Sequence, residues 1–470
     1  MGGGLLQLVA YGAQDVYLTG NPQITFFKVV YRRHTNFALE SIEQSFNGST
    51  NIGSRVSVLV TRNGDLINRV YFSATLRNSS TETSDDENDN GIALVPYFGL
   101  RLLKNIELEI GGQRIDKHYS EWMYIWNELS LPQGKKEGYD AMVGGSVKNT
   151  CTRLSAERFG GTPIQKAERL LTCKRDIIVP LEFWFCRNVG LALPLIALQY
   201  HEVKINIEFS EKKDLVDNHQ GNFCYDYSGT TKETNHNNHA DNKGGVLVLE
   251  NVQLWVDYIF LDTDERRRFA QLSHEYLIEQ LQFTGSEKID GGTSLRNIKM
   301  NFNHPCKELI WTIKPDSEKP AAAAAANAIN GDVAAAVATV DSVPFWNNFT
   351  DNAYNQYNHD EGIVNNSIYE AKMQLNGNDR FAQRSGDYFS IVQPFQHHEN
   401  TPNNYRKGIN VYSFALKPEE HQPSGTLNMS RIDTAHLQIA SRKEGLISIY
   451  AINYNVLRIL SGMGGLAYSN

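Results

Sequence analysis

Apolar and polar residues alternate with a period of two over many short stretches of the chain. Such alternation puts the apolar side chains on one face of a β-strand, as in an antiparallel sheet that covers a core on one side. The apolar positions of these stretches are Val56, Val58 and Val60; Ile106, Leu108 and Ile110; Val203, Ile205, Ile207 and Phe209; Val252, Leu254, Val256, Tyr258 and Phe260; Ile298, Met300 and Phe302; and Leu309, Trp311 and Ile313. The pattern predicts sandwich strands in both halves of the chain.

Turn and helix signals are fewer. Gly111-Gly112 follows an alternating stretch and suits a tight hairpin, because both central residues of a type I′ turn need positive φ. One stretch has helical spacing, with Ser120 placed to cap it, and its apolar positions are Trp122, Ile125, Trp126 and Leu129. We therefore expect a mainly β protein with a few short helices.

Another helix is predicted near the middle of the chain. Asp262 can cap it, Glu265 lies three residues further on, and Arg266 to Leu272 continue it. At 470 residues the chain is too long for one core, since single cores stop growing at roughly 250–300 residues. We place this helix between two sandwich domains; a helix inside one large domain is the alternative.

The two halves also carry a faint echo of one another. Phe183-Trp184-Phe185 is followed by Leu193-Pro194 and then a strand, while Tyr412-Ser413-Phe414 is followed by Pro423-Ser424-Gly425 and then a strand. Duplication of one sandwich is the simplest explanation of this order. The expected limits are an N-terminal segment at 1–24, a first sandwich at 25–212, a loop, strand and connecting helix at 213–275, and a second sandwich at 276–470.

Three polar or low-complexity segments interrupt the strands. They are the acidic stretch Thr81–Gly91, the Asn- and His-rich stretch Asp214–Gly245 and the Ala-rich run Ala321–Val340. None can bury much apolar surface, so each is predicted to be a long surface loop. Loops of this length on a sandwich present the residues that other molecules meet.

Charge and cysteine content exclude several classes of function. The formal charge of −8 argues against a protein that coats nucleic acid, which needs a surplus of Lys and Arg on one face. The aromatic and basic cluster Tyr31-Arg32-Arg33-His34 is interpreted as a solvated strand end or subunit contact. Five cysteines form no C-x-x-C pair, which favours reduced thiols over a zinc site or a disulfide framework. With no signal peptide and no long apolar run, we expect a cytosolic product.

No stretch predicts catalysis or a cofactor. Asp86 to Tyr97 begins like an EF-hand loop but ends in Tyr instead of Glu, and His397-His398-Glu399 lacks the spacing of a zinc helix. The glycines at Gly462–Gly465 lack the Lys-Ser/Thr of a phosphate loop and are better explained by a tail packed against neighbouring backbone. Sequons for possible glycosylation occur at Asn47, Asn78, Asn348, Asn365 and Asn428.

Long runs resemble one known family, the major capsid proteins of nucleocytoplasmic large DNA viruses, with particular likeness to those of chloroviruses and marseilleviruses. These runs extend from one terminus to the other, which makes them more specific than a spaced motif. They are Gly3–Leu5, Gln7–Lys28, Gly190–Val203, Trp255–Asp262, His274–Phe283, Tyr412–Pro418, Gln422–Thr426, Ser430–Asp433, Asn453–Ile459 and Ser461–Tyr468.

The resemblance implies an all-β double jelly roll, made of two eight-stranded antiparallel sandwiches in tandem with a few short helices and long surface loops. It further implies a homotrimer whose six sandwiches form a pseudo-hexameric block that tiles an icosahedral capsid. The implied partners are further copies of the chain, minor capsid and penton proteins, and an inner viral membrane that lies nearby and is not spanned. Direct nucleic-acid contact and a cofactor are not implied. The implied location is the virion, after synthesis and assembly in the host cytoplasm.

Other classes of protein remain as alternatives. A transient scaffold or minor capsid protein would have the same fold. A carbohydrate-binding sandwich would show an exposed aromatic platform, since lectins also use jelly rolls. A glycoside hydrolase would depend on a carboxylate pair that the sequence does not reveal. A stable trimer without turnover would favour the capsid subunit over the carbohydrate-binding protein and the hydrolase, while the termini and Gln422–Asp433 favour a permanent shell over a scaffold.

Overall fold

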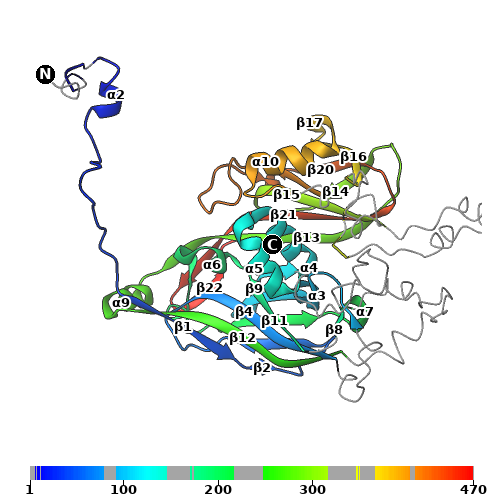
Figure 1. Ribbon diagram of the computed structural model, residues 1–470, viewed down its shortest axis with the longest axis horizontal. Helices are drawn as coiled ribbons and strands as arrows, with labels where there is room; N and C mark the ends of the chain where they lie inside the picture. The colour runs from blue at the N-terminus through cyan, green and yellow to red at the C-terminus, as the bar shows by residue number, and fades with distance from the viewer. Residues whose placement is uncertain are drawn as a thin grey trace, which may run out of the picture. The chain divides into compact units, whose positions relative to one another are not determined.

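The computed structural model describes residues 6, 8–10, 12–78, 92–145, 170–171, 174–215, 247–315, 346–347, 349, 366–402 and 408–468. The chain forms two compact units, Met1–Phe37 and Ala38–Asn470 (Figure 1). The first unit, here called the arm, contains the short helix α2 (Val16–Thr19), and its residues 20–36 form neither helix nor strand. The second unit, here called the body, contains the sandwiches.

The first sandwich consists of two five-stranded sheets. One has the strand order β1-β12-β4-β10, with β9 also paired to β4, and the other has the order β2-β3-β11-β6-β7. Their bounds are β1 (Phe37–Gln44), β2 (Phe46–Asn47), β3 (Arg55–Leu59), β4 (Leu66–Asn78), β6 (Leu103–Ile110), β7 (Gln113–Tyr119), β9 (Arg175–Leu181), β10 (Leu193–Pro194), β11 (Val203–Phe209) and β12 (Leu247–Leu261). A separate two-stranded sheet joins β5 (Ile92–Ala93) to β8 (Leu170–Leu171).

The second sandwich repeats this arrangement. One sheet has the order β13-β21-β15-β18, with β19 paired to β15 and β22 paired to β21, and the other has the order β14-β20-β16-β17. Their bounds are β13 (His274–Ile289), β14 (Arg296–Met300), β15 (Pro305–Pro315), β16 (Ile368–Leu375), β17 (Asn378–Ser385), β18 (Ile409–Ser413), β19 (Leu427–Asn428), β20 (Ala435–Ser441), β21 (Gly445–Leu460) and β22 (Met463–Leu466).

Strand for strand, the two sandwiches have one topology. Strands β1, β12, β4 and β9 occupy the positions that β13, β21, β15 and β18 hold in the second sandwich, and β3, β11, β6 and β7 match β14, β20, β16 and β17. Two facing four-stranded layers in this order make a jelly roll. The predicted all-β double jelly roll is therefore confirmed.

The faint internal repeat in the sequence matches the order of the elements in the two sandwiches, but the residues that it pairs do not occupy equivalent elements. Its first part lies just after β9 in one sandwich and at the end of β18 in the other. Its second part forms β10 in one and precedes β19 in the other, and its strands are β11 and β20. However, Trp184 and Phe185 lie in the helix α6 (Trp184–Arg187), whereas Tyr412 still lies in strand β18. The duplication is therefore preserved in strand order more than in side chains.

Helices are short and lie between strands. Besides α2 and α6 they are α3 (Phe98–Leu102), α4 (Ser120–Ser130), α5 (Gln133–Val143), η3 (Val189–Leu191), α7 (Lys212–Leu215), α9 (Thr263–Gln271), η7 (Tyr388–Val392), α10 (Gln393–His397) and η9 (Met429–Arg431). Helix α9 follows β12 and precedes β13, so it connects the two sandwiches as the sequence predicts. Asp262 is its N-cap and accepts a hydrogen bond from the backbone N–H of Thr263, while Glu265 pairs with Arg268.

Two further local predictions have opposite outcomes. Gly111 and Gly112 both have positive φ, at 58° and 84°, in the hairpin between β6 and β7, as predicted. The prediction that Ser120 caps α4 is wrong: Tyr119, still extended at the end of β7, is the N-cap and gives no side-chain bond. Ser120 is instead the first residue of the helix, because strand and helix follow one another without a loop.

The alternating strands bury their apolar faces as predicted, with one instructive exception. In β11 the residues are alternately buried and half-buried along the whole strand. Strand β15, by contrast, buries Ile310 on one face and Leu309 and Trp311 on the other. Ile310 belongs to the core of the first sandwich and the other two to the core of the second. The expectation of a one-sided sheet is wrong here, because β13, β21 and β15 lie between the two cores (Figure 1).

The predicted loops lie almost wholly outside the described residues. This holds for Thr81–Gly91 and Ala321–Val340, while of Asp214–Gly245 only the first two residues are described, as the end of α7. The predicted domain limits, which depend partly on these segments, stay predictions.

Truncation of Leu198 tests the packing of the run Gly190–Val203, one of the stretches that resemble the capsid family. Its side chain is fully buried in the core of the first sandwich, beside Leu195, which is 2% exposed. We expect Leu198→Ala to lower the free energy of unfolding by more than about 2 kcal/mol, through lost contacts and the cavity left behind. Urea unfolding followed by intrinsic fluorescence measures this loss. An unchanged midpoint would contradict the core position.

Candidate assembly surfaces and the seam between the sandwiches

Aromatic side chains from both sandwiches meet along a seam within the body. Trp122 of α4 is 1% exposed and stacks on Trp126 at 5.7 Å between ring centroids, and it also lies 5.4 Å from Tyr450 of β21. Tyr450 in turn stacks on Phe283 of β13 at 4.7 Å. The seam forms because α4 follows β7 directly and lays its apolar face against the outer face of the second sandwich. Contacts of this kind join the two jelly rolls into one block.

Buried charges lie in the same seam. The Lys307 ammonium is fully buried and lies 2.6 Å from the Glu279 carboxylate, which also lies 3.2 Å from Arg187 of α6. The register of β15 against β21 shifts between Cys306 and Glu308, which marks a β-bulge at Lys307. A bulge of this kind redirects a side chain from the regular alternation of the strand. A buried cation requires such a partner, since desolvation alone costs several kcal/mol per ion. The Arg187–Glu279–Lys307 cluster therefore couples an element of the first sandwich to two strands of the second.

A histidine forms a second buried ionic cluster on β15. The His398 side chain is fully buried, with Nε2 3.0 Å from the Glu308 carboxylate and Nδ1 2.7 Å from that of Glu419. Burial by itself lowers the pKa of His398, but the two carboxylates outweigh burial and raise the pKa to about 9. The imidazole is therefore cationic at neutral pH and ties the segment after α10 to β15.

The raised pKa of His398 predicts alkaline sensitivity. A raised folded-state pKa contributes stability that is complete below about pH 6.5 and is lost as the pH rises through about 9. We expect the wild-type protein to lose on the order of 2–3 kcal/mol between pH 7 and 9.5 through this group. His398→Gln should abolish that part of the pH dependence in urea unfolding. Parallel pH profiles for the two proteins would contradict the buried imidazolium.

The sequence did not predict these ionic clusters. The sequence His397-His398-Glu399 is no metal motif in the structure, which separates its members. His398 is buried, whereas the His397 ring contacts the Leu416 carbonyl oxygen and the backbone N–H of Glu399 donates to the Glu419 carboxylate near the surface. One feature of the sequence does indicate a buried ionic cluster, namely the charged pair Lys307-Glu308 inside the otherwise apolar strand Pro305–Pro315. Charged side chains in such a strand are buried only when they are paired.

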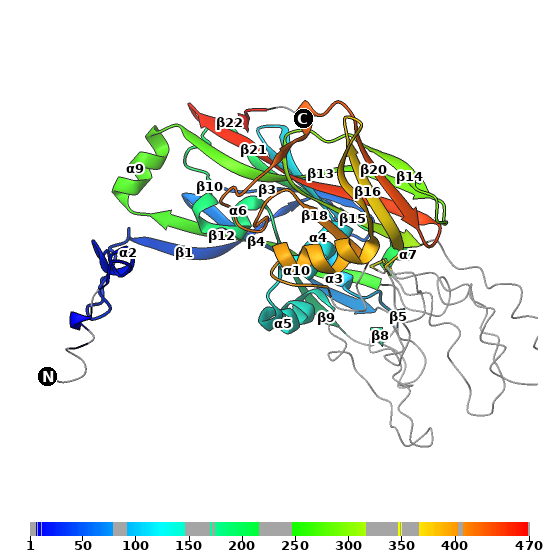
Figure 2. The same cartoon turned by 90° about the horizontal axis from the view of Figure 1, so that it is seen from above.

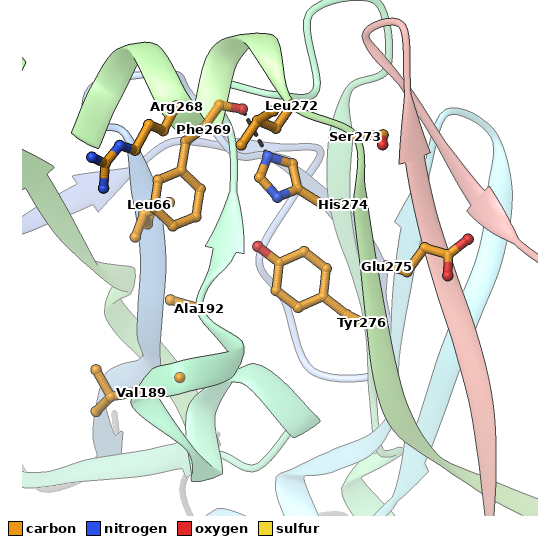
Figure 3. Close-up of a pocket in the computed structure, with 11 residues that line it drawn as sticks. Leu66, Val189, Ala192, Arg268, Phe269, Leu272, Ser273, His274, Glu275 and Tyr276 are labelled. Atoms are coloured by element: carbon orange, nitrogen blue, oxygen red, sulfur yellow. Dashed lines mark hydrogen bonds between the residues drawn. The ribbon is translucent and has the colours of Figure 1, made fainter. Parts of the chain in front are cut away.

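One end of the body carries exposed apolar residues and a cavity. Figure 2 shows α9, β22 and the start of β1 at this end, here called the α9 end. A cavity of about 530 Å³ opens beside α9 (Figure 3), and Val189 and Leu272 at its rim are each 62% exposed. The rings of Phe269, His274 and Tyr276 line its wall, with successive centroid separations of 5.3 Å and 6.0 Å.

The arm exposes an unusual amount of apolar surface. Phe26 is 87% exposed, Phe27 is 97% exposed and Tyr31 is 86% exposed. Other large apolar side chains of the arm that are at least half exposed are Leu6, Leu8, Val9, Val16, Leu18, Ile24, Val29, Val30 and Phe37. Many exposed large apolar side chains within one short segment are typical of an interaction site. The predicted contact residues Tyr31 to His34 lie in this exposed stretch and in no strand.

The structure places only some of the sequon residues. Asn47 at the end of β2 and Asn428 at the end of β19 are exposed, and Asn428 accepts a hydrogen bond from the N–H of Ser430. The side chain of Asn78, together with Asn348 and Asn365, falls outside what the structure describes. Nothing in the fold brings Asn47 and Asn428 together.

Other chemical candidates give no site among the described residues. In those ranges no three His, Cys, Asp or Glu side chains are placed to hold a metal ion, and no helix is long and apolar enough to cross a membrane. Cys186 and Cys306 are free thiols, and burial raises the pKa of Cys186 to about 12. Gly464 and Gly465 pair with the backbone of β21 as part of β22, which confirms the packed tail predicted for Gly462–Gly465, and a Cβ at Gly464 would lie 2.6 Å from the Leu198 side chain. The first half of the EF-hand-like stretch, residues 86–91, lies outside the described ranges.

Comparison with known proteins gives matches over the whole chain. A family model described as the major capsid protein N-terminus matches residues 25–262, and one described as the large eukaryotic DNA virus major capsid protein matches residues 265–465. The major capsid protein of Pyramimonas orientalis virus is 47% identical, and that of Paramecium bursaria Chlorella virus 1 is 42% identical; each alignment covers 100% of both chains.

Solved structures agree with these matches. A chain of the PBCV-1 virus capsid is 36% identical with a TM-score of 0.69, and the match covers 95% of this chain and 100% of that chain. The Faustovirus major capsid protein shares the fold at 13% identity and a TM-score of 0.66, over 96% of this chain and 94% of that chain. With both sandwiches matched by family models and full-length relatives above 40% identity, the chain belongs to the major capsid proteins of large eukaryotic DNA viruses.

Proposed function

We propose that this capsid protein self-assembles into homotrimers, and that these pseudo-hexameric capsomers tile an icosahedral shell. The observation that carries the proposal is the repetition of one strand order in two sandwiches of a single compact body. Three copies then bring six similar sandwiches around a threefold axis, so that a trimer presents six similar flanks to its neighbours. A single sandwich per chain would need six chains for the same outline.

The seam between the sandwiches supports this proposal. A building block of a shell must keep its two halves in fixed orientation while neighbours press on its flanks. The stacked rings around Trp122 and the buried Arg187–Glu279–Lys307 cluster fix that orientation from inside the chain. Buried polar and packed aromatic contacts of this kind specify one arrangement of the parts.

Electron microscopy of the purified protein tests the outline. Negatively stained particles should show a six-sided outline with threefold symmetry in the class averages. Averages that show isolated two-lobed particles at micromolar concentration would contradict the capsomer. Microscopy also discriminates against a carbohydrate-binding monomer or a glycoside hydrolase, neither of which requires a six-sided assembly.

The remaining partners are part of the same proposal. Minor capsid and penton proteins, and an inner membrane that lies near the shell without being spanned, would contact the capsomers, and direct contact with nucleic acid and enzymatic turnover are not expected. Synthesis and assembly would take place in the host cytoplasm. The proposed domain limits remain 1–24, 25–212, 213–275 and 276–470.

Glycan attachment is proposed at exposed sequons. Of the predicted sites Asn47, Asn78, Asn348, Asn365 and Asn428, the first and last have exposed side chains in the described structure. Peptide mass spectrometry of assembled particles decides which of them carry sugar.

A further inference from the structure

The arm and the α9 end of the body both expose apolar groups that could make further contacts. The arm exposes Phe26 and Phe27 almost fully, and the body opens a cavity of about 530 Å³ whose wall carries three rings. Exposed aromatic side chains, and a cavity whose lining combines rings and aliphatic groups with Arg268 and Glu275, each offer apolar contacts to a further group. We propose that, within the trimer assumed in the proposed function, Phe26-Phe27 of one copy's arm enters the α9-end cavity of a neighbouring copy.

The shape and chemistry of the cavity suit an aromatic side chain. Phe269 packs against the cluster that contains Leu66 and Ala192, and Figure 3 shows the rings of His274 and Tyr276 beside this group. The Nε2 atom of His274 lies 2.8 Å from the carbonyl oxygen of Phe269, so the ring is held in place rather than turned into the cavity. Leu272 and Val189 at the rim are exposed and add apolar surface at the entrance. A phenylalanine ring inserted here would meet ring faces and aliphatic groups on several sides.

The reach of the arm fits a neighbouring copy. Residues 29–36 contain neither a helix nor a turn, and the eleven residue-to-residue steps from Phe27 to Ala38 span at most about 36–40 Å when extended. A body of 433 residues, Ala38 to Asn470, has a radius of gyration of roughly 22 Å, so this reach is comparable with the distance between equivalent points in adjacent copies. A run of this length, without helix or turn, is long enough to bridge the distance to a second copy.

The opposite charges of the arm and the body also favour the arm of a second copy as the occupant of the cavity. The arm contains Lys28, Arg32 and Arg33 against Asp15 alone, a formal charge of +2. Because the whole chain has a formal charge of −8, the body has −10. An arm with this sign is attracted to the body of another copy and guided toward it over a Debye length of about 8 Å at physiological ionic strength. Head-to-tail insertion around a threefold axis closes into a ring, so every arm and every cavity is used.

A pair of cysteines tests the exchange. Phe27→Cys and Leu272→Cys, combined in one chain, place one thiol on the arm and the other at the rim of the cavity. Under mild oxidation, we expect at least half of the chains to run as covalent dimers and trimers on a non-reducing gel and to return to single chains with reductant. The controls are the two single variants, the wild type with its five cysteines, and Phe27→Cys with Leu416→Cys, since Leu416 is 74% exposed but does not line the cavity.

Each outcome has a definite meaning. Light scattering on the double variant before oxidation establishes whether trimers are present. Trimers without the interchain disulfide, or with linkage no greater than in the Leu416→Cys control, overturn the arm exchange and leave the capsomer intact. A disulfide within one chain, identified by peptide mapping at single-chain mass, overturns it in favour of the chain's own cavity. A protein that is monomeric before oxidation overturns the capsomer and the exchange together.

Discussion

Replacing Glu279 with leucine is expected to destabilise the protein by about 3–5 kcal/mol, because the Lys307 ammonium would then be buried without its carboxylate partner. Lys307 has no solvent exposure, so its side chain cannot reach water without opening the seam. Arg187, which is 23% exposed, can turn outward and contributes less to the loss. Urea unfolding of Glu279→Leu against the wild type measures the change.

The matched control is a surface ion pair. Asp290 and Arg296 lie 3.1 Å apart with side chains that are 66% and 57% exposed, so Asp290→Asn should cost no more than about 1 kcal/mol. Adding Lys307→Met to Glu279→Leu should recover part of the stability, since the unpaired cation is then gone. A double variant that is less stable than Glu279→Leu alone would contradict the account of a buried, paired lysine.

Truncating Trp122 is expected to cost about 3–5 kcal/mol, the range for a large aromatic side chain removed from a packed core. Trp122 is 1% exposed and stacks against rings from both sandwiches, so its loss leaves a cavity in the seam that neither sandwich can fill by itself. The midpoint of urea unfolding for Trp122→Ala, followed by far-ultraviolet circular dichroism, measures the effect.

Phe395→Ala provides the comparison for Trp122→Ala. Phe395 lies in α10 and is 77% exposed, so the same kind of truncation should change stability by no more than about 0.5 kcal/mol. Equal effects for the two variants would show that the seam around Trp122 is not packed as described.

Local patterning was enough to predict much of this fold. The period of two in Val203 to Phe209 and the paired glycines at Gly111-Gly112 depend on neighbours in sequence, and both are confirmed. The connecting helix after Asp262 is confirmed for the same reason, since its cap and its end are local signals. The assignment to capsid proteins needed more, namely resemblance along the whole chain, because a jelly roll alone hosts many functions.

The seam could not be predicted, because it depends on contacts between residues far apart in sequence. Glu279, Lys307 and Arg187 come from two sandwiches, and no spacing between them marks a cluster. The second buried face of β15 was missed likewise, since a strand with alternating Leu309, Trp311 and Ile313 does not show what covers Ile310. The Ser120 cap failed because the strand before it ends only at Tyr119.

Light scattering coupled to size-exclusion chromatography tests the central claim most directly. The chain has a mass of 53.0 kDa, so a homotrimeric capsomer should elute with a mass of about 159 kDa that stays constant over a wide range of protein concentration. A mass of 53.0 kDa at every concentration would contradict the claim that this chain is a self-assembling shell subunit.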